Sequence, residues 1–152
     1  MNDKKITGVS DGTLPKHAIN KQQLDNLMKL YYYSTNITFK NKQVVFSKNN
    51  SNLNISQGIY LISYHLPINI SSDYNSKGTI QLITRSIINR ANILYYYNIP
   101  KNTPGHLTNT HIYLIDNSGL LKIQLNGSGV DFNTRSRYIK YIIIYKLFDN
   151  LT

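Results

Sequence analysis

The stretch from Gly58 to Leu66 constrains the fold more than any other part of this chain. It combines β-branched and aromatic residues, and Gly58 marks a turn into the run. The positions 59–62 are all apolar, and successive side chains of a strand point to opposite faces of a sheet. Both faces therefore need a cover. The stretch predicts a central strand that packs on a second sheet of the same chain and, on its other face, on a neighbouring subunit.

A second stretch, residues 138–148, has the same property near the C-terminus. Its middle is apolar on both faces, which is typical of another central strand. Two strands of this kind predict a sandwich whose outer face is also covered. Self-association of the chain is the simplest way to cover this outer face.

Composition favours β structure before any window is considered. The chain has no Glu, little Ala and 13 Tyr, and such a chain is a poor helix former. Short β runs separated by Asn, Ser, Gly and Pro clusters follow from Tyr32 onward. Asp116 to Gly119 is the strongest hairpin signal, between two alternating runs. The expected strands are 37–39, 43–47, 53–56, 59–67, 78–87, 93–99, 107–115, 120–125 and 138–147.

This strand count predicts an all-β fold, a two-sheet jelly-roll sandwich, in a head domain that covers residues 34–152. Residues 1–33 are expected to form an arm and a short helical neck. Asn20 and Gln23 fit a capping box, which predicts a helix start. The helix would carry one apolar stripe. That stripe packs either on the head or on its own copies in an oligomer, and it consists of Leu24, Leu27, Met28 and Tyr31.

The charge balance bounds the partners. The net charge is +10, from 17 Lys and Arg against 7 Asp, which favours acidic partners such as nucleic acid, anionic membrane or acidic glycans. The charges are scattered rather than clustered, which is also typical of a soluble surface. There is no cysteine, and no window has the pattern of an export signal or a membrane span. We expect synthesis in a cytoplasm and no membrane insertion.

Several motifs resemble the C1q and tumour-necrosis-factor-like trimeric heads. One is the segment 54–66, which is similar to the Gly-apolar-Tyr strand of that family, and another is the segment 119–127, which is similar to its Gly-strand-Gly segment. A closing apolar strand that ends at Ile144 and Tyr145 completes the order. The resemblance implies a ten-stranded jelly roll that forms a homotrimer about a three-fold axis.

The resemblance also implies which faces of the two central strands meet the axis. Tyr60, Ile62 and Tyr64 would face the interior. A shift of one residue in the last strand would exchange its axial set for Tyr138, Ile142 and Ile144. The implied trimer interface consists of Leu24, Met28, Leu61, Ser63, His65, Ile139, Tyr141, Ile143 and Tyr145.

The N-terminal arm carries a second resemblance. Residues 6–13 and 17–25 are similar to stalk-to-neck segments of phage tail fibres and trimeric adhesins, in which a comparable stretch opens a short trimeric helix. This resemblance also implies a three-fold fibrous context, and it favours the oligomer interpretation of Leu24 and Met28.

Candidate catalytic and metal sites are sparse. The chain lacks Glu, Cys and a Gly-x-Ser-x-Gly motif, so we expect no enzyme and no cofactor. His106 and His111 flank one loop and strand, but no third ligand stands at metal-site spacing. Asp116 and Asp131 are the late-loop carboxylates that a calcium site would use, and they are not clustered in sequence. No metal site is predicted.

Two further groups are candidates for ligand contacts. Arg135, Arg137 and Lys140 precede or open the last strand, where three-fold symmetry would gather them into an anion- or glycan-binding site. The alternative is that they simply point outward. The tyrosine runs 31–33 and 95–97 offer stacking surfaces for sugars or bases, although core or interface packing is the favoured interpretation.

These observations together predict a non-enzymatic, homotrimeric head of a virion or fibre, which mediates attachment to a host receptor or glycan. It would be displayed on the surface of a virus, virophage or phage. The alternative is a C1q-like structural protein of a spore or cell surface. A third class, a basic nucleic-acid-binding sandwich, predicts an affinity for DNA that falls steeply with salt.

Overall fold

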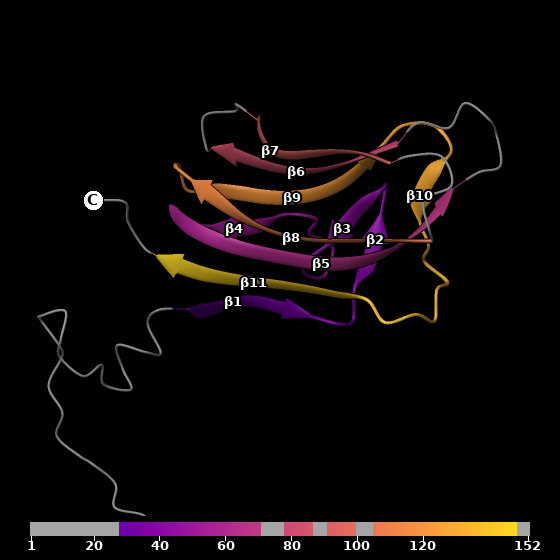
Figure 1. Ribbon diagram of the computed structural model, residues 1–152, viewed down its shortest axis with the longest axis horizontal. Helices are drawn as coiled ribbons and strands as arrows, with labels where there is room; N and C mark the ends of the chain where they lie inside the picture. The colour runs from indigo at the N-terminus through magenta and orange to yellow at the C-terminus, as the bar shows by residue number, and fades with distance from the viewer. Residues whose placement is uncertain (1–27, 71–77, 87–90, 100–104, 149–152) are drawn as a thin grey trace, which may run out of the picture.

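The computed structural model describes residues 28–70, 78–86, 91–99 and 105–148, which form two facing antiparallel sheets (Figure 1). The five-stranded sheet contains β1 (Lys29–Ser34), β5 (Gly58–Ile70), β8 (His106–Ile115), β10 (Val130–Phe132) and β11 (Tyr141–Phe148). The six-stranded sheet contains β2 (Thr38–Lys40), β3 (Gln43–Val45), β4 (Leu53–Ile55), β6 (Gly78–Ser86), β7 (Ala91–Ile99) and β9 (Gly119–Asn126). The described residues contain no helix, and hence none of the length and hydropathy needed to cross a membrane.

The strand order explains why both long apolar strands are central. In the five-stranded sheet the order is β1-β11-β5, with β8 on the other side of β5 and β10 paired with the end of β5. The six-stranded sheet runs β2-β3-β9-β6-β7, and β4 also pairs with β9. The chain crosses repeatedly between the sheets, for instance from β4 to β5 and from β7 to β8. This two-sheet, jelly-roll-like sandwich agrees with the expected fold class.

The core lies between the sheets and is built by the period-two alternation of the strands. In β5, Tyr60, Ile62 and Tyr64 are buried, as the resemblance to C1q-like heads implied. In β11, Ile142 and Ile144 are buried, which selects one of the two registers considered for this strand. Its odd-numbered residues therefore face outward. The stacked rings of Phe39 and Phe132, with centroids 4.3 Å apart, close the core between β2 and β10.

The N-terminal part departs from the expected helix. Tyr31, the last residue of the expected helical stripe, lies in strand β1, which pairs with β11 and has a bulge between Leu30 and Tyr32. The three consecutive tyrosines favour an extended chain, and β11 would otherwise expose an unpaired edge. The sandwich therefore begins at Lys29, ahead of residue 34. The expected arm and the start of the helix, including Leu24, lie outside the described residues.

The turn from Asp116 to Gly119 does not make a hairpin. It joins β8, which pairs with β5, to β9, which pairs with β6, so it carries the chain from one sheet to the other. Strand β10 was not expected from the sequence, because its three residues follow a Gly-Ser-Gly segment that is typical of a loop. Strand β11 starts at Tyr141 instead of residue 138, so Tyr138 and Ile139 belong to the preceding loop.

Candidate functional site

The outer face of the five-stranded sheet is the most unusual surface of the described chain, and we call it the apolar face. Alternate residues of four strands point to it, and the register aligns them in rows. Leu30, Tyr145, Leu61 and Ile112 form one row, and Tyr33, Ile143, Ser63 and Thr110 form the next. Tyr141, His65 and Thr108 form a third row, and Ile59 pairs with Leu114 at the other end. Large apolar side chains are exposed here; Ile112, for example, is 64% exposed.

No lysine, arginine or aspartate stands in these rows, although the chain carries 17 Lys and Arg. The outer face of the six-stranded sheet is different. Gln124 donates hydrogen bonds to Gln81 Oε1 (3.4 Å) and Asn126 Oδ1 (3.1 Å), and Lys122 lies on the same face. That face has the polar, hydrated surface expected of a sheet in water. The apolar face lacks it.

One end of the apolar face is polar but uncharged. Ser63 and Thr110 hydroxyls are hydrogen-bonded across the strands at 2.7 Å, and His65 Nδ1 lies 2.5 Å from the Thr108 hydroxyl. The His65 ring stacks on Tyr141, with centroids 6.0 Å apart. Burial, and secondly the nearby ring of His106, lower the pKa of His65. Its neutral form is therefore favoured.

The structure brings most of the predicted interface residues together. Leu61 pairs with Tyr145, Ser63 with Ile143, and His65 with Tyr141, all on the apolar face. Two others lie apart from these rows: Ile139 is 79% exposed in the loop before β11, and Met28, also exposed, precedes β1.

The predicted basic site is a loop rather than the start of a strand. Arg135 and Arg137 are exposed between β10 and β11, and the backbone N–H of Arg135 donates to Asn133 Oδ1. Lys140 is half-buried, with its Nζ 5.7 Å from the centre of the Phe39 ring. Within one subunit the three basic residues therefore lie in one loop, but the two arginines are exposed and Lys140 contacts an aromatic ring. We call residues 133–140 the basic loop.

The tyrosine run 95–97 alternates between inward and outward positions, and its inward residues are only partly buried. In β7, Tyr96 is 55% exposed and Tyr97 is 39% exposed, while Tyr95 is partly buried against the core. Tyr96 faces outward, opposite Gln81, whereas Tyr97 pairs with the core residue Ile80. Because β7 is the edge of its sheet, an inward-facing tyrosine there still reaches solvent.

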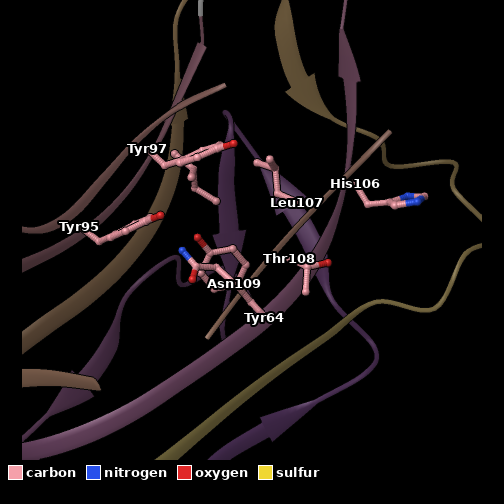
Figure 2. A pocket seen from close by; sticks show the side chains of 8 residues that line it. Tyr64, Tyr95, Tyr97, His106, Leu107, Thr108 and Asn109 are labelled. Atoms are coloured by element: carbon pink, nitrogen blue, oxygen red, sulfur yellow. The ribbon is translucent and has the colours of Figure 1, made fainter. Parts of the chain in front are cut away.

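An open cavity of about 300 Å³ lies between two sheet edges, β7 of the six-stranded sheet and β8 of the five-stranded sheet, and we call it the edge cavity. The register accounts for its lining, because Tyr64 pairs with Asn109 and Ile80 with Tyr97. Figure 2 shows the rings of Tyr95 and Tyr97 projecting from β7 into this space, with Asn109 beside Tyr64. The sequence did not predict this cavity, since nothing local says which two edges face each other.

The described residues contain no group of three or more His, Cys, Asp or Glu placed to hold a metal ion. His106 lies 5.0 Å from His65, and His111 lies 5.1 Å from Tyr95, measured between ring centroids, so the two predicted histidines have different neighbours. Asp116 is in the turn after β8 and Asp131 is in β10.

Comparison with known proteins yields no match to a family model and no match to a curated protein. Among solved structures, the chain is similar to a carbohydrate-binding module from a Cellvibrio mixtus lichenase, solved in complex with cellotriose. The two chains are 18% identical, the alignment covers 78% of this chain and 89% of the module, and the TM-score is 0.37.

Proposed function

We propose that this chain is a non-enzymatic, homotrimeric β-sandwich head that mediates attachment at the surface of a virion or fibre. The observation that carries the proposal is the uncharged apolar face. A row such as Tyr145, Leu61 and Ile112 would leave apolar surface in water in a monomer. Burial of that surface contributes about 25 cal/mol per Å² to association.

The chemistry of the apolar face favours a second and third copy over an unrelated partner. A basic chain with a net charge of +10 repels its own copies wherever lysine or arginine side chains meet. The apolar face is the surface from which these charges are missing, so copies can approach there without such repulsion. The resemblance of segments 54–66 and 119–127 to C1q-like heads supports a closed three-fold arrangement rather than a dimer.

The two ends of the sandwich suit a displayed head. Strand β1 begins and β11 ends at the same end, since Lys29 pairs with Lys146. The basic loop precedes Tyr141 and so lies at the other end of β11 (Figure 1). A head held at its N-terminal side would present the basic loop away from the attachment point. Three linked copies would also strengthen weak single contacts by multivalency.

Light scattering on a matched pair of variants tests the proposal. The wild-type mass should be close to three times 17.5 kDa. Ile112→Asp places a carboxylate on the apolar face and should reduce the mass to that of one chain, because a charge buried in an interface without a partner costs several kcal/mol. Ile93→Asp is the control, since Ile93 is 55% exposed and faces outward on β7, the edge of the other sheet.

Three outcomes are decisive for association. A trimer that only Ile112→Asp dissociates supports the proposal. A wild-type monomer would overturn it, as would a trimer that both variants leave intact. For the attachment role, the wild type and Ile112→Asp are compared on cells of a candidate host: the trimer should bind detectably at concentrations at least about tenfold lower. Equal binding would refute a role for multivalency.

A further inference from the structure

The edge cavity has the composition of a ligand site rather than of an incompletely filled core. Inward-facing positions of a sandwich normally carry aliphatic side chains, as Ile80 and Leu82 do in β6. The facing positions of β7 carry Tyr97 and Tyr95 instead. These tyrosines keep part of their surface accessible, and the volume of about 300 Å³ is at the lower limit of small-molecule pockets.

The floor of the edge cavity carries a polar pair. Tyr64 is buried and its side chain is hydrogen-bonded to that of Asn109, which is half-buried on β8. Burial raises the pKa of the Tyr64 phenol, so the hydroxyl stays protonated at neutral pH. An asparagine amide has two donors and an acceptor with two lone pairs, so Asn109 has capacity for further partners after one hydrogen bond to Tyr64.

The residues that line the edge cavity indicate which ligand charge it would favour. Its residues are Tyr64, Ile80, Tyr95, Tyr97, His106, Leu107, Thr108 and Asn109, with no lysine, arginine or aspartate among them, and the side chains of Thr108 and His106 point away from the tyrosines (Figure 2). An anionic ligand such as a phosphate or a sulfated sugar would find no cation there, so the site suits a neutral molecule. The basic loop is a separate surface.

The aromatic side chains indicate which shape of ligand the edge cavity would fit. Figure 2 shows the rings of Tyr95 and Tyr97 side by side, with their hydroxyl groups toward the same side. Tyr97 is the more exposed ring and offers an aromatic surface next to hydrogen-bonding groups. A flat apolar surface beside an amide and hydroxyls matches a saccharide ring, which has C–H faces and a rim of hydroxyl groups.

The neighbouring part of the seam between β7 and β8 has unused polar capacity as well. The hydroxyl of Tyr113 is buried and has no hydrogen-bond partner among the described residues, and its ring contacts Tyr95 edge-on at 6.4 Å between centroids. A buried polar group without a partner is uncommon in native proteins and points to a ligand or solvent role.

We propose that the edge cavity binds a neutral saccharide residue, with Tyr97 as the stacking surface and with Asn109 and Tyr64 as hydrogen-bond partners. The site lies within one subunit and goes beyond the proposed attachment role, because it names a ligand class and a place that do not depend on association. The proposal of a trimer through the apolar face and the proposal of a saccharide site in the edge cavity can therefore be tested separately.

The test is titration of the isotope-labelled full chain with glucose, galactose, mannose and N-acetylglucosamine, followed by amide NMR shifts. At least one sugar should shift the amides of Tyr97 and Asn109. Tyr97→Ala should weaken that binding by about tenfold or more, while Tyr97→Phe, which keeps the ring, should stay within about threefold. Asn109→Ala should also weaken it about tenfold.

Tyr96→Ala is the matched control, because the adjacent Tyr96 faces the opposite side of the same strand. It should leave the affinity unchanged. The proposal is overturned if no sugar shifts these amides, if Tyr96→Ala weakens binding as much as Tyr97→Ala, or if adenosine binds here and the sugars do not. Light scattering on each variant reports association independently, so a loss of trimer is not mistaken for a loss of sugar binding.

Discussion

Threonine substitutions at two adjacent isoleucines of β11 distinguish the core-facing side of this strand from its apolar face. Ile144 is fully buried between Ile62 and Tyr32, whereas its neighbour Ile143 lies on the apolar face between Ser63 and Tyr33. Threonine is also β-branched, so the strand preference is nearly unchanged and the comparison reports on environment.

The magnitudes follow from burial. Ile144→Thr removes the Cδ1 methyl group, which costs about 0.8 kcal/mol, and replaces the Cγ1 methylene by a buried hydroxyl without a partner, which costs about 1–3 kcal/mol. With the small cavity that remains, unfolding should become easier by about 3 kcal/mol. Ile143→Thr leaves its hydroxyl in water in a separated subunit, so the change there should stay within about 0.5 kcal/mol.

In the proposed trimer, Ile143→Thr acts on association instead. A loss of about 1 kcal/mol per subunit is about 3 kcal/mol per trimer, or about two decades in the dissociation constant. That constant has units of concentration squared, so the midpoint concentration should rise about tenfold. Sedimentation equilibrium measures the midpoint, and urea unfolding of dilute protein measures subunit stability. Equal destabilisation of the subunit by both variants, or an unchanged midpoint in Ile143→Thr, would refute the assignment of faces.

Three further predictions concern individual side chains. A Cβ at Gly78 would lie 2.5 Å from Val130 Cγ2, so Gly78→Ala should lower the free energy of unfolding, measured in urea, by about 1–3 kcal/mol. In the double variant with Val130→Ala, the total loss should be at least about 1 kcal/mol smaller than the sum of the two single losses. The pKa of His65 is lowered in the folded chain, so the unfolded chain binds more protons and the melting temperature should fall as pH decreases below about 6.5. His65→Asn should reduce this slope, and an unchanged slope would refute the role of His65. Replacement of Arg135 and Arg137 by Ser should weaken salt-sensitive binding to a sulfated-glycan array, and undiminished binding would remove the basic loop as an anion site.

The central strands could be predicted from sequence because each has one fully buried face. A shift of one residue in β5 would move Tyr60 and Ile62 from the core to the outside, so the alternation leaves little freedom. In β11, which is apolar on both faces, the resemblance to C1q-like heads implied the outward set as one of two registers. The structure selects it by burying Ile142 and Ile144.

The errors arose where local signals did not decide the partner. The spacing of Met28 and Tyr31 fits a helical stripe, but an edge position beside β11 overrides a weak helix preference. The turn at Gly119 was recognised, yet turn chemistry does not tell whether the next strand stays in the same sheet. The edge cavity depends on β7 facing β8, a relation between strands that pair with different neighbours.

The pairing of β1 with β11 also sets how the sandwich responds to mechanical load. The strands are antiparallel, so β1 begins at the end opposite the basic loop, which precedes β11. A pull between Met28 and the basic loop would run along the strand axes and load the hydrogen bonds of the β1–β11 ladder together, in shear. A pull between Met28 and the end of β11 would open them one after another. A head tethered at its first strand and loaded at its far loop therefore meets force in its stronger direction.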